Sequence, residues 1–221
     1  PGHVALHLSP VPTDCATLVR FEQRLSLTRG LVSATIVTDS GELRIEIWGD
    51  VDRNVLVLEV DDGRTERRGA EVELSHWRNE AECLVGGQFL VSQEIEQRSV
   101  TEQLPPGQRD PYLGRGIGIA VGTDAPAQAR WYGRENAGLL LPEEGPRHYR
   151  VLVACEVTAA EEPTDTVDLS AAYYRGGKWT GGGPIAAAVA TLEAAMAVSP
   201  EALRTRHDEW WVEFWERSEV R

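Results

Sequence analysis

Short stretches of alternating apolar and polar residues recur along the first 158 residues, with no helical pattern between them. The clearest pair is 31–38 and 42–48, which Asp39-Ser40-Gly41 separates in the manner of a hairpin turn. Because the side chains of a strand alternate between its two faces, each stretch presents one apolar face. Many short strands without intervening helices predict an antiparallel β-sandwich or barrel.

The same pattern predicts nine strands in this region. We place them at 3–8, 31–38, 42–48, 54–60, 72–77, 88–95, 116–121, 138–141 and 149–158. Asp61-Asp62-Gly63 is expected to form a turn after the fourth strand, and residues 101–115 are expected to form a loop. Calcium binding at the Asp61–Gly63 turn is a minor alternative, because the ligand spacing of an EF-hand is missing.

The composition changes after Thr158. Glu161–Asp165 has the composition of a linker, and Gly176–Gly183 that of a flexible connection without the residue order of a P-loop. Two helices are predicted next, over 184–198 and about 200–219, the second with Ser199 as N-cap and Pro200 as its first residue. We therefore divide the chain into a sandwich domain, 1–160, and a linker with two helices, 161–221.

The second predicted helix carries an unusually aromatic face. Its stripe consists of Leu203, His207, Trp210, Trp211, Phe214, Trp215 and Ser218. Large apolar faces are normally covered by a partner. This helix is expected to pack either on its own sheet or on a second domain, and we favour a helix that joins two domains. His207 is expected to be a hydrogen-bonded polar anchor at that interface.

The formal net charge of −13 argues against nucleic acid and anionic membranes as partners. It suits a neutral sugar or another protein. No apolar run approaches the roughly 20 residues that span a bilayer, and no signal peptide is evident. Because the chain starts at Pro1 without an initiator Met, removal of an upstream segment stays open. A soluble protein is expected, in the cytoplasm or secreted.

The ionisable and sulfur side chains give no sign of a catalytic or metal site. Cys15, Cys83 and Cys155 form no CxxC pair and are expected to be small buried apolar residues. His3 and His7 fall on one strand face, where a two-histidine metal site is a remote alternative to a solvated or capped pair. We predict no catalytic residue, no metal and no cofactor within this chain.

Two aromatic clusters suggest contact with sugar. Trp77 is followed by Arg78 and Asn79, and Trp131 by Tyr132. Sugar sites often combine an aromatic face with planar hydrogen-bonding side chains. The alternative for both tryptophans is a place in the core near the ends of the sheet.

Three segments resemble the N-terminal region of a group of glycoside hydrolases. His207–Ser218 is similar to an H-x-x-W-W-x-x-F-W-x-x-S segment of that group. Phe21–Gly30 is similar to its F-x-Q-x-L-D-L-x-x-G strand and turn, with Ser26 at the usual Asp position. Asp110–Gly118 is similar to a loop and strand of bacterial relatives without an assigned activity. The group resembles glycoside hydrolase family 95 and combines a β-sandwich, helical linkers and an (α/α)6 barrel.

The resemblance implies a super-sandwich with linker helices, placed before a catalytic barrel whose carboxylates lie beyond Arg221. Such a domain would support or shape the substrate cleft of a glycoside hydrolase in carbohydrate metabolism. Two other functions stay open: a stand-alone carbohydrate-binding module and an interaction or dimerisation sandwich. A homodimer is a further partner state that the sequence allows.

Overall fold

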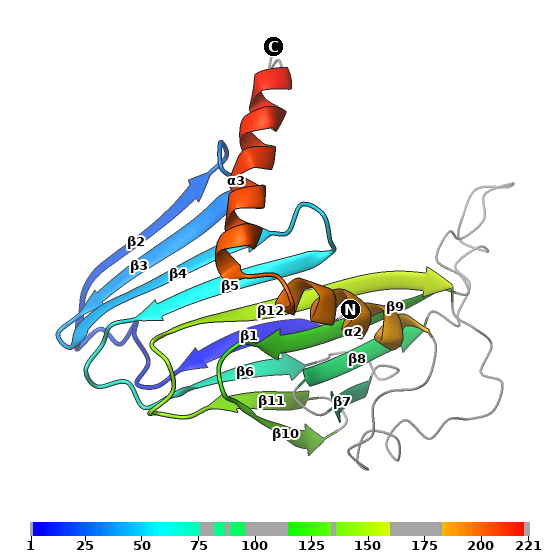
Figure 1. Cartoon of the computed structure of the whole chain (residues 1–221). Coiled ribbons are helices and arrows are strands. Elements are labelled where there is room, and N and C mark those ends of the chain that lie inside the picture. Colours follow the sequence, from blue (N-terminus) through cyan, green and yellow to red (C-terminus); the bar gives the residue numbers. More distant parts are fainter. Residues whose placement is uncertain are drawn as a thin grey trace, which may run out of the picture.

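The computed structural model describes residues 2–75, 82–86, 89–95, 115–133, 136–159 and 183–218. Within this part, twelve strands are followed by two helices at the C-terminal end (Figure 1). Every strand pairing is antiparallel. The predicted fold class, a β-sandwich followed by helices, is confirmed.

The sandwich has one large and one small sheet. The eight-stranded sheet has the order β2 (Leu18–Ser26), β3 (Leu31–Thr38), β4 (Gly41–Gly49), β5 (Val55–Asp62), β12 (His148–Ala159), β9 (Arg115–Thr123), β8 (Phe89–Ile95) and β7 (Glu82–Gly86). The four-stranded sheet has the order β1 (His3–Leu8), β6 (Ala70–Ser75), β11 (Asn136–Leu141) and β10 (Gln128–Gly133). The small sheet therefore covers only part of the large one.

One core lies between the two sheets. Alternation places one face of each central strand there, and the buried side chains include Ile36, Leu43, Val60, Val72, Leu74, Leu90, Val121, Leu139 and Val151. We call this side of the large sheet its inner face.

A second core covers the outer face of the large sheet. Helix α2 (Pro184–Met196) buries Ile185, Ala188, Leu192 and Ala195, whose spacing puts them on one stripe. The helix approaches β9 so closely that a Cβ on Gly118 would lie 2.0 Å from the carbonyl oxygen of Pro184. Only glycine fits at position 118, and its missing side chain lets the start of α2 lie directly on the sheet.

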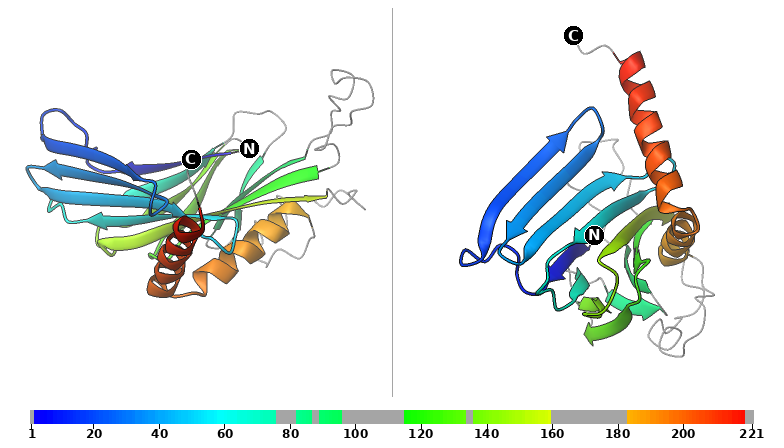
Figure 2. Two further views of the ribbon diagram at one scale, coloured as in Figure 1. Left: turned by 90° about the horizontal axis from the view of Figure 1, so that it is seen from above. Right: turned by 60° about the vertical axis from the view of Figure 1, so that its left-hand side comes forward.

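Helix α3 (Pro200–Arg217) begins as the sequence predicts. The side chain of Ser199 accepts a hydrogen bond from the backbone N–H of Ala202 at 3.2 Å, and Pro200 opens the helix. The first turns of α3 lie on the large sheet and the later turns project beyond it (Figure 2). Within the described residues, no single helix has the length and apolar composition to cross a membrane. Helices α2 and α3 meet that test only together, and they are bent by 98° at their junction.

Several strand predictions need correction. Strands β7 and β10 are missing from the prediction, because they lack a clear alternation of apolar residues; β2 is anticipated only through the family resemblance. Strand β5 continues through Asp62, where the sequence predicts a turn. Asp62 is buried and accepts two hydrogen bonds from the side chain of Arg64, both at 2.8 Å, so an ion pair compensates the buried charge.

The expectation that the cysteines are buried is wrong for two of them. Cys15 and Cys155 are free and exposed. Cys15 lies in the turn before β2. Cys155 points to the inner face of β12, at a position that the small sheet leaves uncovered. Several predictions concern residues outside the described part. These are the side chain of Cys83, the loop predicted at 101–115 up to residue 114, and residues 76–81, 160–182 and 219–221.

Candidate interdomain interface on the C-terminal helix

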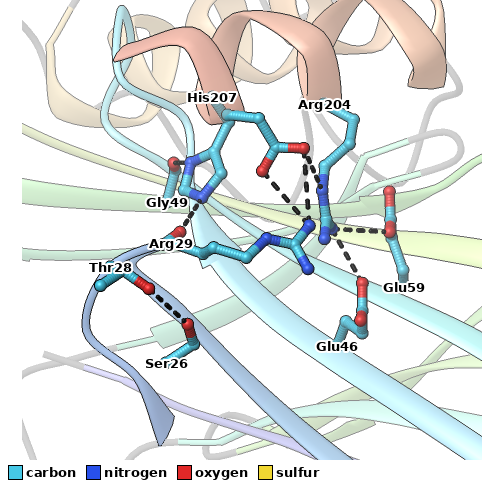
Figure 3. Close-up of polar contacts among 9 residues, drawn as sticks. Ser26, Thr28, Arg29, Glu46, Gly49, Glu59, Arg204 and His207 are labelled. Carbon is cyan, nitrogen blue, oxygen red and sulfur yellow. Dashed lines mark hydrogen bonds and ion pairs between the residues drawn. The ribbon is translucent and has the colours of Figure 1, made fainter. Parts of the chain in front are cut away.

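His207 anchors helix α3 to the sheet of its own chain. Its side chain is buried, with Nδ1 3.0 Å from the carbonyl oxygen of Gly49 and Nε2 2.7 Å from that of Arg29 (Figure 3). Its ring also lies 4.8 Å from that of Trp48. Both ring nitrogens therefore lie within hydrogen-bond distance of a backbone carbonyl oxygen. The expected polar anchor therefore binds the sandwich itself.

Arg204, one turn earlier on α3, joins the helix to β4 and β5. Its Nη1 lies 2.9 Å from Glu46 and 3.3 Å from Glu59, and its guanidinium lies 5.6 Å from the ring centre of Trp48. Asp208 links Arg204 to Arg29 by ion pairs of 3.5 and 3.3 Å. Charged contacts from two turns of α3 thus reach β4, β5 and the turn after β2. These contacts surround the buried indole of Trp48.

The turn between β2 and β3 receives the next residues of the helix. Gly30 adopts a φ of +55°, and its missing side chain leaves room for the indole of Trp211. The Nε1–H of Trp215 donates to the carbonyl oxygen of Leu27 at 3.1 Å. His207, Trp211 and Trp215 therefore form one row, each four residues from the next, that contacts residues 27–30.

A second aromatic row lies beside the first. The rings of Trp210 and Phe214 stack with centroids 5.2 Å apart, and Trp210 meets Trp211 edge-on at 5.1 Å. Phe214 is 37% exposed, and Trp210 is half-buried. We call Trp210 and Phe214 the exposed flank of α3. The predicted interface residues thus divide between contacts within the sandwich and this flank.

Sequence reasoning finds both halves of this arrangement but not their contact. The strand–turn segment Phe21–Gly30 and the helix segment His207–Ser218 carry separate resemblances. They lie about 180 residues apart in the chain, as the Arg29–Asp208 contact illustrates. The signal that could have joined them is Gly30, because a glycine at the end of a hairpin permits close approach of a large ring.

The second candidate surface is at the edge of the small sheet. Trp131 and Tyr132, consecutive residues of β10, are 44% and 43% exposed. The hydroxyl of Tyr132 donates to Glu71 at 2.6 Å, and this hydrogen bond, with burial, raises the pKa of Tyr132. Trp77, Arg78 and Asn79 lie outside the described residues. Trp131 is not the core residue that the alternative interpretation required.

The remaining polar candidates do not assemble a metal site. His7 lies 2.9 Å from Glu73 on the neighbouring strand β6, so its partner is a carboxylate and not His3. No group of three metal-binding side chains occurs among the described residues. Asp62 at the predicted turn pairs with Arg64 in the buried ion pair of β5.

An open groove of about 710 Å³ lies where the small sheet leaves the inner face of the large sheet uncovered. Its apolar lining includes Val4, Leu56, Val153 and Val157, with Cys155 beside them. No aromatic side chain is among the described residues of this lining.

Comparison with known proteins supports the fold. Residues 1–109, just under half of the chain, match the family model described as a domain of unknown function, DUF5703. No curated protein sequence matches significantly. A putative kojibiose phosphorylase from human microbiome has a similar structure, with a TM-score of 0.52 and 10% identity over 97% of this chain. A bacterial glucoamylase complexed with acarbose gives the same TM-score and identity over 96% of it.

These likenesses concern only part of the larger proteins. The chain spans 31% of the length of each of the two structures. At 10% identity they establish a shared fold. A specific similarity to glycoside hydrolase family 95 stays a prediction from the sequence.

Proposed function

We propose that this chain is the non-catalytic sandwich domain of a glycoside hydrolase, and that the exposed flank of α3 packs against a catalytic helical barrel in the same polypeptide. The observation that carries the proposal is the division of α3. One side of α3 is fixed to the sandwich through Arg204, His207, Trp211 and Trp215. The flank beside it carries the half-buried Trp210 and the exposed Phe214. A rigidly held helix with an uncovered apolar flank is suited to setting the position of a second domain.

Two further observations support the proposal. The fold is shared with part of a putative kojibiose phosphorylase and of a glucoamylase, both named as carbohydrate-active enzymes. The aromatic segment of α3 resembles the segment that precedes the barrel in enzymes similar to glycoside hydrolase family 95. In this proposal the catalytic carboxylates belong to the barrel. The sandwich supports the barrel and shapes one side of the substrate cleft.

The test compares the native polypeptide with the 221-residue chain. We expect an intact mass several tens of kDa above the 24.4 kDa of this chain. In the longer protein, Trp210→Ser combined with Phe214→Ser should separate the thermal transitions of the two domains and lower glycosidase activity. In the 221-residue chain the same pair should change stability little. Val11→Ser, at an exposed apolar residue away from α3, serves as the control.

Two outcomes would contradict the proposal. A native mass near 24.4 kDa would leave no barrel to contact. A large loss of stability in the 221-residue chain after the double substitution would mean that the flank belongs to the core of the sandwich itself.

A stand-alone carbohydrate-binding module is the second candidate, favoured by the exposed pair Trp131 and Tyr132. It predicts retardation of the chain in gels that contain a soluble polysaccharide, and loss of that retardation on Trp131→Ala. Because Tyr132 is held by Glu71, Tyr132→Phe should have a smaller effect than Trp131→Ala. Unchanged mobility with each of a panel of neutral polysaccharides would remove this candidate.

A further inference from the structure

Within the part of the chain that the structure describes, strand β2 pairs with β3 alone and forms the end of the eight-stranded sheet, at the left side of Figure 1. Its other edge has no strand partner among these residues. Seven consecutive residues of β2, Val19–Leu25, are exposed. An exposed strand edge offers a row of free N–H and C=O groups to another strand.

The two faces of β2 differ in chemistry. Phe21, Gln23 and Leu25 lie opposite Ile36, Ala34 and Val32 of β3, on the apolar inner face. Glu22 and Arg24 point to the outer face and form an ion pair of 3.2 Å with each other. Phe21 is 51% exposed and Leu25 is 62% exposed, although both belong to the apolar side.

The sequence of β2 is symmetric in chemistry about Gln23. Two residues before and after Gln23 stand Phe21 and Leu25, both apolar; one residue before and after stand Glu22 and Arg24, of opposite charge. We propose that a second copy of this chain pairs with β2 in antiparallel orientation, with Gln23 on the two-fold axis. Each Phe21 then lies opposite Leu25 of the second copy, and each Glu22 opposite its Arg24.

The side chains of β2 favour this register over the other possible registers. A two-fold axis at Glu22 would put Glu22 opposite itself and Arg20 opposite Arg24, and an axis at Arg24 would put two arginines together. An axis at Phe21 pairs Arg20 with Glu22 but puts exposed Val19 opposite Gln23. Registers shifted by an odd number place apolar residues opposite charged ones. Only the axis at Gln23 places Phe21 opposite Leu25 on the inner face and Glu22 opposite Arg24 on the outer face.

A second copy suits this edge better than an unrelated strand because β2 in antiparallel orientation is complementary to itself. Isologous contacts require a surface that matches itself, and dimers with two-fold symmetry are the commonest oligomers. Pairing would join two eight-stranded sheets into one continuous sheet and would bury Phe21 and Leu25 at the junction. Helix α3 lies on the outer face, so its exposed flank stays available.

The oligomeric state of the 221-residue chain tests the proposal. Sedimentation velocity over a series of concentrations should show a monomer of 24.4 kDa in equilibrium with a particle of twice that mass. Arg24→Glu places two carboxylates opposite each other at two positions and should weaken the dimer at least about tenfold. The combined change Glu22→Arg and Arg24→Glu restores both opposite-charge pairs and should restore the dimer.

Arg44→Glu is the matched control. It reverses the same charge on the same outer face, but on β4, two strands away from the edge. Arg44 also has a neighbouring carboxylate, Glu42, as Arg24 has Glu22. The control variant should dimerise as the parent chain does. A dimer that Arg24→Glu and Arg44→Glu weaken equally, or that neither weakens, overturns the proposed register.

A covalent test locates the axis. With Cys15, Cys83 and Cys155 replaced by Ser, Gln23→Cys should form an intermolecular disulfide on mild oxidation, because directly opposed Cβ atoms lie within reach of one. Glu22→Cys, one residue from the axis, should cross-link much more slowly. Equal cross-linking of both variants overturns the proposal.

Two further results, one of them on a longer native polypeptide, also overturn the proposed dimer. One is a chain that stays monomeric at all concentrations. The other is a longer native polypeptide that is monomeric and in which the β2 amides are protected from hydrogen exchange, since another segment would then cover this edge. Neither result bears on the proposed contact of α3 with a barrel, so the two proposals fail independently.

Discussion

Gly30 lies directly against the indole of Trp211: a Cβ added to Gly30 would be 2.0 Å from Cε2 of Trp211. The contact joins the β2–β3 turn to the aromatic helix at the point where α3 leaves the sheet. Because Gly30 also has a φ of +55°, both its conformation and its missing side chain are needed.

Gly30→Ala should destabilise the chain by about 2–4 kcal/mol, from left-handed strain and from displacement of Trp211. Chemical denaturation followed by tryptophan fluorescence would measure the loss. Gly49→Ala is the control, because a Cβ there would meet no atom within 4 Å. Equal and small effects of the two substitutions would show that α3 is not held at this turn.

His207→Ala should lower the free energy of unfolding by about 2–4 kcal/mol. The substitution opens a cavity beside Trp48 and leaves the carbonyl oxygens of Gly49 and Arg29 without their donor. His3→Ala, at an exposed histidine, should be neutral. The measurement is urea denaturation of the three proteins. A neutral His207→Ala would mean that water replaces the imidazole at no cost.

Arg64→Met should be among the most damaging substitutions, with a loss of about 3–5 kcal/mol. It leaves the buried carboxylate of Asp62 unpaired and also removes a hydrogen bond of 2.7 Å to the carbonyl oxygen of Pro10. Thermal denaturation would measure the loss. Arg24→Met breaks an exposed ion pair and should cost less than about 1 kcal/mol.

Removing both charges tests this explanation. Because an apolar pair avoids the burial of a single charge, Asp62→Leu with Arg64→Met should be less destabilised than the sum of the two single variants. A strictly additive result in thermal denaturation would show that the two side chains are not energetically coupled.

Tyr149 makes stability depend on pH in the alkaline range. Burial, with the nearby charge of Asp62, raises its pKa from 10.0 to about 12. The unfolded chain therefore loses this proton before the folded one does, and stability falls as the pH rises from about 10 to about 12. The expected loss from this group is about 2 kcal/mol.

Tyr149→Phe should flatten the pH dependence in that window. It should cost little at neutral pH, because the buried hydroxyl has no hydrogen-bond partner among the described residues. Urea denaturation of both proteins across the alkaline range would measure this difference. The same alkaline slope in the variant and the parent chain would assign it to other groups.

The strand-rich fold is predictable from local sequence patterns, because the two-residue alternation of apolar side chains is a local property of each strand. The start of α3 is predictable in the same way, since Ser199 and Pro200 act on their own helix turn. Other features depend on tertiary contacts, which the alternation does not encode. The burial of Asp62 depends on Arg64, and the exposure of Cys155 depends on where the small sheet ends.

Which aromatic side chains of α3 contact the sandwich likewise depends on the tertiary structure. The helical periodicity predicts that Trp210, Trp211, Phe214 and Trp215 lie near one another. It does not predict which of them contact the sandwich. That depends on the β2–β3 turn, which lies about 180 residues earlier in the chain and accepts a hydrogen bond from Trp215 at Leu27. Contacts between such distant segments follow from the packing of the whole chain, which local periodicity does not encode.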